Sequence, residues 1–138
     1  MILYATMGLP GSGKTTKATE LIKEDNNIVR VNRDDIRTMT GHSYDIGIEV
    51  SVLEAQNAMI RNLLDRNYSV VCDDTNLKGT ERLEQLAKEA GAEFVLIDLT
   101  NVPIEECIRR DKLRVNPVGE SEIRRMYDAF LERQARNV

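Results

Sequence analysis

An eight-residue glycine-rich segment near the start of this chain restricts its possible folds more than any other feature. Residues 8–15 read Gly-Leu-Pro-Gly-Ser-Gly-Lys-Thr and match the pattern G-x-x-x-x-G-K-[ST] in full. From the composition of the chain, roughly 0.002 random matches to this pattern are expected. The segment follows an apolar, β-branched run at residues 2–6 and precedes a segment of helical period at residues 13–24. The sequence therefore predicts a strand, a phosphate-binding loop and a helix in direct succession.

The residue types in this loop suit the chemistry of ATP or another nucleoside triphosphate. Glycine lets consecutive backbone N–H groups turn toward phosphate oxygens, and the N-terminus of the following helix adds a partial positive charge. We expect Lys14 to bridge the β- and γ-phosphates and Thr15 to offer its hydroxyl to Mg²⁺ or Mn²⁺. The predicted nucleotide-binding residues are Gly11, Ser12, Gly13, Lys14, Thr15 and Thr16.

The loop alone does not say how the nucleotide is used, since GTPases, ATPases, kinases and non-catalytic sensors share it. The guanine-reading pattern Asn/Thr-Lys-x-Asp is absent from the sequence. A small GTPase is therefore disfavoured.

Short β-branched runs alternate with longer segments of helical period, which is typical of a parallel sheet covered by helices. We predict an α/β fold of the P-loop NTPase type, an open parallel sheet of about four strands flanked by helices. Its ligand crevice is expected beyond the carboxyl ends of the strands. Predicted strands span residues 2–6, 28–31, 68–72 and 94–99; predicted helices span residues 13–24, about 49–66 and 80–90, the last ended by Gly91, followed by one opened by Pro103 that carries Arg109, Arg110 and Arg114 and one capped by Ser121.

Charge and composition limit the partners and the compartment. A net charge of -4 gives no global positive field for nucleic acid, so any polyanion site is local. Of the 19 basic residues, 13 are arginines, which offer planar two-point contacts to phosphate. No apolar run approaches the roughly 18–20 residues of a membrane span, and the first residues lack the charges of a signal peptide. We expect a cytoplasmic protein without membrane contact, with Cys72 and Cys107 as reduced thiols outside any zinc site.

Two acidic segments follow predicted strands. Residues 32–37 read Asn-Arg-Asp-Asp-Ile-Arg, and residues 73–76 read Asp-Asp-Thr-Asn. In a phosphotransferase a carboxylate near the γ-phosphate orients the attacking hydroxyl, and an arginine can clamp an anionic group of the acceptor. A charged turn whose ions pair with each other is the alternative for residues 32–37, which the adjoining phosphate loop disfavours. Strand alternation predicts that only one of Asp73 and Asp74 faces the crevice.

A third polar segment is the basic run at residues 109–114. Arg110 and Arg114 are four residues apart, so on a helix they share a face and could close over a triphosphate. A solvated basic helix face is the alternative.

Together these residues resemble the bacteriophage-type polynucleotide 5′-hydroxyl kinases. The order and spacing of the motifs are more specific than the phosphate loop alone, and they extend over nearly the whole chain. The motifs are Gly-x-Pro-Gly-Ser-Gly-Lys-Thr at 8–15, Asn-Arg-Asp-Asp-Ile-Arg at 32–37, Asp-Thr-Asn-Leu at 74–77, Arg110 with Arg114, and Ile-Arg-x-Met-Tyr at 123–127.

The resemblance implies a single P-loop polynucleotide kinase domain over residues 1–138. It makes Asp34 the general base on the 5′-hydroxyl and Arg37 the contact to the phosphate 3′ to the accepting nucleoside, with Asp74 supporting Arg37. Thr75 and Asn76 then shape the acceptor pocket. Lys14, Arg110 and Arg114 stabilise the donor phosphates, the two arginines on a mobile helical lid.

Two segments depart from the family pattern. Val118-Gly119 stands where relatives often have Val-Pro, which leaves the stacking of the donor base undefined. Residues 39–48 show no residue match, and their His42 is expected to be a solvated loop residue.

The resulting hypothesis is a kinase that transfers the γ-phosphate of ATP or another nucleoside triphosphate to a 5′-hydroxyl end of DNA or RNA, in nucleic-acid end repair. A phage-encoded protein of this kind would act in the host cytosol. A P-loop kinase acting on a small metabolite or nucleotide is the first alternative, although residues 32–37 and 74–77 argue against it. A non-catalytic switch that binds nucleoside triphosphates is the second.

Overall fold

Parallel strand pairing organises the chain. The computed structural model describes residues 1–42 and 44–132. Its sheet has four strands in the order β2-β3-β1-β4, and every pairing is parallel. The predicted α/β fold with an open parallel sheet is confirmed. The strands are β1 (Ile2–Met7), β2 (Ile28–Arg30), β3 (Ser69–Cys72) and β4 (Glu93–Asp98).

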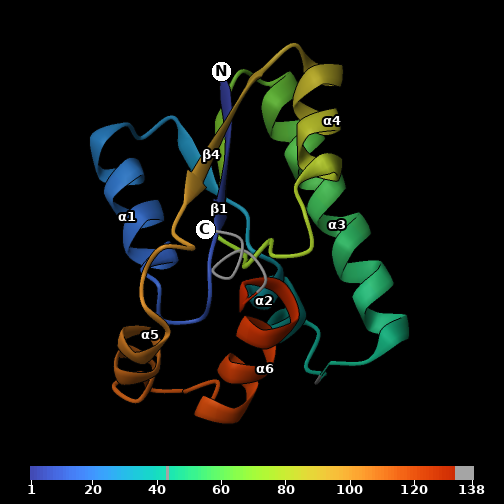
Figure 1. The fold of residues 1–138 in the computed structure, drawn as a ribbon. Helices are drawn as coiled ribbons and strands as arrows, with labels where there is room; N and C mark the ends of the chain where they lie inside the picture. Colours follow the sequence, from blue (N-terminus) through green and yellow to red (C-terminus); the bar gives the residue numbers. More distant parts are fainter. Residues whose placement is uncertain (43, 133–138) are drawn as a thin grey trace.

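Helices cover both faces of the sheet and its carboxyl edge (Figure 1). One layer is α1 and the opposite layer is α3 with α4, while α5 and α6 lie beyond the ends of the strands. The helices among the described residues are α1 (Lys14–Glu24), α2 (Arg33–Met39), α3 (Ile46–Asp65), α4 (Glu81–Ala90), α5 (Ile104–Asp111) and α6 (Glu120–Phe130).

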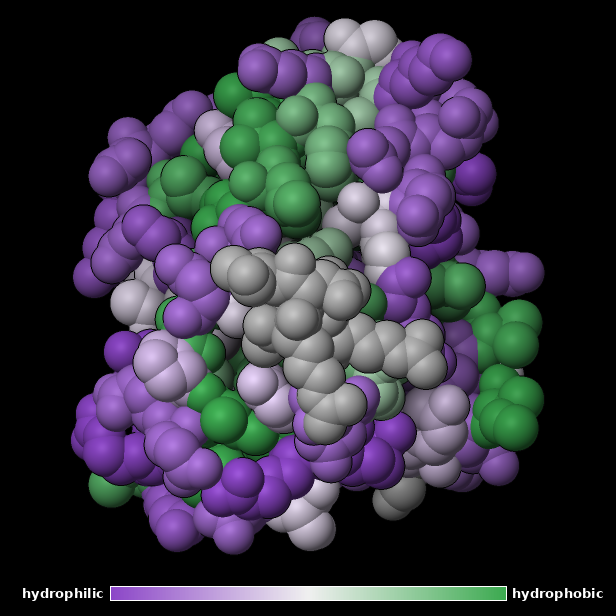
Figure 2. All heavy atoms as spheres, viewed as in Figure 1, coloured by the Kyte–Doolittle hydropathy of each residue, from purple (hydrophilic) through white to green (hydrophobic). Residues whose placement is uncertain are grey.

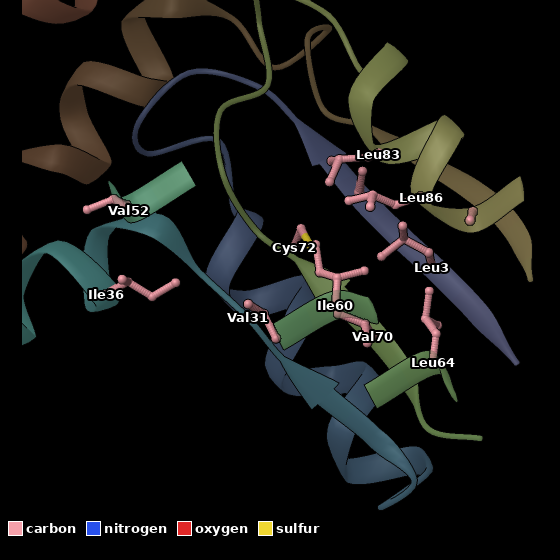
Figure 3. Close-up of a cluster of buried hydrophobic side chains, with 12 residues drawn as sticks. Leu3, Val31, Ile36, Val52, Ile60, Leu64, Val70, Cys72, Leu83 and Leu86 are labelled. Atoms are coloured by element: carbon pink, nitrogen blue, oxygen red, sulfur yellow. The ribbon is translucent and has the colours of Figure 1, made fainter. Parts of the chain in front are cut away.

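The main core lies between the sheet and the layer of α3 and α4 (Figure 3). Alternation along β3 divides its side chains between the layers: Val70 and Cys72 enter this core, whereas Val71 packs on the α1 side. A separate cluster joins Leu9 of the phosphate loop to Cys107 of α5 and Ile123 of α6. The helices at the carboxyl edge are therefore anchored to the loop itself.

Residues 33–39 form a helix where only a charged segment was expected. The Asn32 side chain caps α2 by accepting a hydrogen bond from the Asp35 N–H at 2.9 Å, and Ile36 is buried beneath it. Asp45 caps α3, which begins at Ile46, three residues ahead of the predicted start. Ser121 is not a cap, because Gly119 occupies the cap position of α6. Gly91 ends α4 in the left-handed conformation, as predicted.

Strand β4 forms one edge of the sheet. Figure 2 shows hydrophobic side chains gathered over this edge, where Leu96 is 42% exposed. Among residues 1–42 and 44–132, no helix has both the length and the apolar character needed to cross a bilayer.

Truncation of Ile60 tests the core between α3 and the sheet. Ile60 is fully buried, so Ile60→Ala should lower the free energy of unfolding by about 2–5 kcal/mol. Met59 precedes it on α3 and is 45% exposed, so Met59→Ala is the matched control and should have little effect. Urea unfolding measures both values, and equal losses would contradict this core.

Candidate nucleotide and acceptor site

The phosphate loop is held in a conformation that only glycine adopts easily. Gly11 and Gly13 have φ angles of 85° and 103°, in the left-handed region. A Cβ atom on Gly11 would overlap the carbonyl oxygen of Cys107 on α5. The loop therefore needs glycine both for its turn and for its close contact with α5.

Two cavities meet at the carboxyl edge of the sheet. The smaller, about 380 Å³, lies over the phosphate loop, and the larger, about 910 Å³, lies among α2, the start of α3, the loop after β3, and α6. The residues in the walls of both are Pro10, Asp34, Asp74, Thr75 and Val118.

The smaller cavity collects most of the residues predicted to act on the nucleotide. Ser12 is the exception: it is buried beneath the loop, and its hydroxyl has no hydrogen-bond partner within the described part of the chain. The predicted residues in the wall are Gly11, Gly13, Lys14, Thr15, Thr16, Asp34, Asp74, Thr75, Arg110 and Arg114.

Lys14 is held inside the loop. Its Nζ donates to the Leu9 carbonyl oxygen at 2.8 Å. Burial, and next the charge of Arg114, lower the pKa of Lys14 to about 8. An anion bound in the cavity would offset the repulsion from Arg114 and favour the charged form of Lys14. This ammonium is therefore suited to binding phosphate.

The donor set fits a magnesium ion bound mainly through phosphate. Mg²⁺ keeps several waters and takes few protein ligands when phosphates are present. Thr15 offers a hydroxyl in the smaller cavity, and Asp73 offers a carboxylate in the same wall.

Helix α5 is shorter than expected, which corrects the position of Arg114. The helix ends at Asp111, so Arg110 and Arg114 do not share a helix face. Asp111 is 1% exposed and accepts hydrogen bonds from the Val118 and Gly119 N–H groups at 3.0 and 2.9 Å, which turns the chain. Both arginines still reach the smaller cavity, one from the helix and one from the loop that Asp111 holds.

Glu106 neutralises the basic face of α5. Its carboxylate accepts from Arg109 Nη2 at 2.5 Å and from Arg110 Nε at 2.9 Å. These arginines lower the pKa of Glu106 to about 2. Arg110 Nη1 also approaches the Gly11 carbonyl at 3.5 Å, so α5 contacts the loop through a side chain as well as its backbone.

Arg37 lies in the larger cavity between two carboxylates. Its Nη1 donates to Asp34 Oδ1 at 2.6 Å, and its Nε and Nη2 donate to both oxygens of Glu49. These bonds raise the pKa of Arg37 and lower that of Glu49. Glu49 orients Arg37 from the first turn of α3. No sequence pattern marks Glu49 as functional, because an acidic first turn is common in helices.

Asp73 and Asp74 both line the smaller cavity, so the expectation that only one faces it is wrong. Strand β3 ends at Cys72, and the alternation stops with it. Asp73 accepts from Arg30 Nε at 2.7 Å and from the Asn32 amide at 3.1 Å.

Asp74 makes no hydrogen bond or ion pair with Arg37, which it was expected to support; the partners of its carboxylate among the described residues are Arg33 and Gln56. Its Oδ1 accepts from the Arg33 N–H at 3.0 Å, and its Oδ2 accepts from Gln56 Nε2 at 2.7 Å. Asp74 therefore fixes the first turn of α2 to the buried amide of α3.

Thr75 and Asn76, the residues expected to shape the acceptor pocket, line the larger cavity. Both also tie the strand ends together: the Thr75 carbonyl accepts from the Gly8 N–H at 3.0 Å, and Asn76 Nδ2 donates to the Thr6 carbonyl at 2.8 Å. His42 is exposed and lines neither cavity, whereas Tyr44 of the same segment lines the larger one. Ser43 lies outside the described residues.

A protein-family model described as an AAA domain matches residues 3–133. The chain belongs to this AAA-domain family. The family match and the kinases among its relatives together show that this chain has a kinase-like P-loop domain. Membership implies use of ATP or another nucleoside triphosphate, typically with Mg²⁺.

Relatives of this AAA-domain chain include kinases with different acceptors. L-seryl-tRNA(Sec) kinase of Methanococcus maripaludis is 28% identical over 94% of this chain and 52% of the relative. A chain of the Pnkp1/Rnl/Hen1 RNA repair complex is 27% identical with a TM-score of 0.82, over 98% of this chain and 45% of that one. This chain thus spans about half the length of both.

The same fold occurs in a small-molecule kinase. The APS kinase CysC of Mycobacterium tuberculosis, in complex with AMPPNP and APS, has a TM-score of 0.61 and 19% identity, over 79% of this chain and 67% of that chain. This likeness concerns the fold alone.

Gly11→Ala tests the contact between the loop and α5. Any alanine at a positive φ costs about 1–2 kcal/mol, and at Gly11 the overlap with Cys107 adds to that strain. Gly41→Ala is the matched control, because Gly41 has a φ of 76° and open space around its Cβ position. We expect Gly11→Ala to lower the melting temperature more than Gly41→Ala does. Gly11→Ala should also weaken nucleotide binding, whereas Gly41→Ala should leave it unchanged. Equal effects in calorimetry would contradict the contact.

Nucleotide affinity should depend on the charge of Lys14. Because its pKa is lowered to about 8, affinity for ATP should fall as the pH rises through 8, by at most tenfold per unit. A lysine at its ordinary pKa would show no fall until about pH 10. Titrations between about pH 7.5 and 9.5 measure this, and Lys14→Arg should remove the slope because a guanidinium stays charged. A flat wild-type profile would contradict the lowered pKa.

Proposed function

We propose that this chain is a polynucleotide 5′-hydroxyl kinase, which transfers the γ-phosphate of ATP or another nucleoside triphosphate to the 5′-hydroxyl end of DNA or RNA. The position of Asp34 carries the proposal. Its carboxylate stands in the wall of both cavities, between the phosphate loop and the larger cavity. A hydroxyl bound in the larger cavity can meet both this carboxylate and a γ-phosphate on the loop.

Asp34 acts as the general base in this reaction. The acceptor oxygen forms a bond to the γ-phosphorus as the bond from phosphorus to the oxygen bridging the β-phosphate breaks, and the acceptor proton passes to the carboxylate. The transition state is loose, so the carboxylate mainly orients the hydroxyl. Arg37 holds Asp34 at 2.6 Å and is itself fixed by Glu49, which gives the base a defined direction.

Lys14, Arg110 and Arg114 stabilise the charge on the donor phosphates. All three line the smaller cavity. Cations placed in advance around the transferring group lower the barrier because they need little reorganisation during the reaction. Mg²⁺, held by Thr15 and the phosphates, would supply further neutralisation of the phosphate oxygens.

The larger cavity suits a nucleic-acid end better than a small metabolite. It combines arginines with apolar side chains of Leu77, Met126 and Phe130, a mixture that can take up phosphate and nucleobase together. Arg37 is then the contact to the phosphate 3′ to the accepting nucleoside, and Thr75 and Asn76 shape the pocket around it. The names of two relatives, an RNA repair complex and a tRNA kinase, support a nucleic-acid acceptor.

A labelling experiment tests the proposal. The protein is incubated with γ-labelled ATP, Mg²⁺ and a 5′-hydroxyl oligonucleotide, and a 5′-deoxy oligonucleotide of the same sequence is the control acceptor. Label is expected on the first oligonucleotide only. Label on a small metabolite, with none on DNA or RNA, would replace the proposal by a metabolite kinase, and ATP binding without transfer would indicate a switch.

Asp34→Asn tests the assigned base. The substitution keeps the size of the side chain and removes its basicity, so transfer should fall by about 10²–10⁴-fold while ATP affinity changes little. Asp35→Asn is the matched comparison, because Asp35 is adjacent but pairs with Arg30 at 2.9 Å and does not line the larger cavity. Single-turnover rates measure both. A larger loss in Asp35→Asn would assign the base to Asp35.

A further inference from the structure

Arg82 lines the larger cavity and makes no ion pair with any carboxylate of the described residues. It extends from the first turn of α4, is half-buried, and donates to the neutral oxygens of Gln56, at 2.9 Å, and Asn57. Burial, and next the charge of Arg33, lower its pKa. The surroundings therefore disfavour this charge as long as no anion is present.

Arg33 faces the same part of the cavity and is incompletely paired. Its Nε lies 3.4 Å from Asp74 Oδ2, yet this buried nitrogen makes no hydrogen bond to any described residue. Asp74 already accepts from the Arg33 backbone and from Gln56. The Nε atom is itself buried, but the Arg33 side chain as a whole is 28% exposed, so the rest of the guanidinium can meet an incoming phosphate.

The other carboxylates of this cavity are already engaged. Arg37 pairs with Asp34 and Glu49, and Arg125 binds both oxygens of Glu122. Only Asp74 remains for the two cations Arg33 and Arg82. Over the whole described wall of this cavity, five cationic side chains face four carboxylates, an excess of one positive charge that one phosphodiester would balance; the cations are Arg33, Arg37, Lys78, Arg82 and Arg125.

The spacing between Arg33 and Arg37 matches the spacing between successive phosphates of a nucleic-acid strand. The two residues are four apart on α2, so their Cβ atoms are about 5–6 Å apart on one helix face. Successive phosphates of an extended strand are a similar distance apart. If Arg37 contacts the first phosphate, the next phosphate reaches Arg33.

We infer that Arg33 and Arg82 bind the second phosphate of the acceptor strand, next to the phosphate that Arg37 contacts. The inference rests on the proposed function for the identity of the acceptor. It predicts that an end with two phosphodiesters binds more tightly than an end with one. A small metabolite or a single nucleotide leaves this pair of arginines without its anion.

A binding experiment tests the inference without requiring phosphate transfer. The acceptors are 5′-hydroxyl tetranucleotides, each with one neutral methylphosphonate linkage at the first, second or third position. Dissociation constants are measured by fluorescence anisotropy without nucleotide. Losing a charged hydrogen bond at the second linkage should weaken wild-type binding roughly tenfold or more.

Arg82→Gln should remove this difference. In the variant, the neutral second linkage should change the dissociation constant by less than about twofold, because the partner charge is already gone. Arg82→Lys should keep part of the difference, since it keeps the charge but not the planar contacts to Gln56 and Asn57. Arg124→Gln is the matched control: Arg124 is exposed, pairs with Glu105 and lines neither cavity.

A purely structural role for Arg82 gives a different result. Both Arg82 variants would then lose thermal stability, but a neutral second linkage would weaken binding to Arg82→Gln as much as it weakens binding to the wild type. That result would overturn the inference. Arg33→Gln repeats the test without touching the amides of α3, for the case that Arg82 variants do not fold. The inference would also be overturned if Arg82→Gln removed the effect of a neutral first or third linkage, a result we call coupling at that linkage, in place of the second. Failure of the fully charged tetranucleotide to bind would overturn it as well. Binding with this coupling but without labelling by ATP would support the phosphate site and contradict the proposed kinase activity.

Discussion

The hydrogen bonds that join the carboxyl ends of β1 and β3 set the position of the phosphate loop relative to the acidic loop after β3. The Thr6 hydroxyl donates to the Asp74 carbonyl at 2.9 Å, Asn76 donates back to the Thr6 carbonyl, and the Gly8 N–H donates to Thr75. Parallel pairing places both strand ends at one edge of the sheet, and these bonds bring the phosphate loop against the acidic loop. The two cavities adjoin at this junction.

Opposite charges are arranged locally within an acidic protein. The net charge is -4, yet the two cavities collect Lys14, Arg33, Arg37, Arg82, Arg110 and Arg114 around a few carboxylates. Most of these cations have an internal partner, which holds the side chain in place without ligand. Such pairs contribute little to stability when exposed, so their main effect here is on geometry.

The sequence predicted best those features that depend on residues close together in the chain. The phosphate loop, the alternation of strands and helices, and the stop at Gly91 depend on neighbouring residues, and the structure agrees with them. Helix α2 was missed because it is short and buries one apolar residue, Ile36, so its period is not visible. The end of α5 was missed because Asp111 acts on residues seven and eight positions later.

Partners distant in the chain were also beyond sequence reasoning. Glu49 meets Arg37 across 12 residues, and Arg82 meets Gln56 across 26. Each of these residues has an ordinary place on a helix and gives no pattern of its own. Only the packing of α3 against α2 and α4 shows which charges remain without a partner.

The contact between Glu106 and Arg110 has a consequence for turnover. A carboxylate that engages the guanidinium imitates an anionic ligand, and a phosphate that takes the Nε donor of Arg110 competes with it. This intramolecular competition reduces the affinity of the arginine for substrate and product alike. A transferase that must release a nucleoside diphosphate after each cycle gains from such a competitor, since tight capture of the donor would also retain the spent nucleotide.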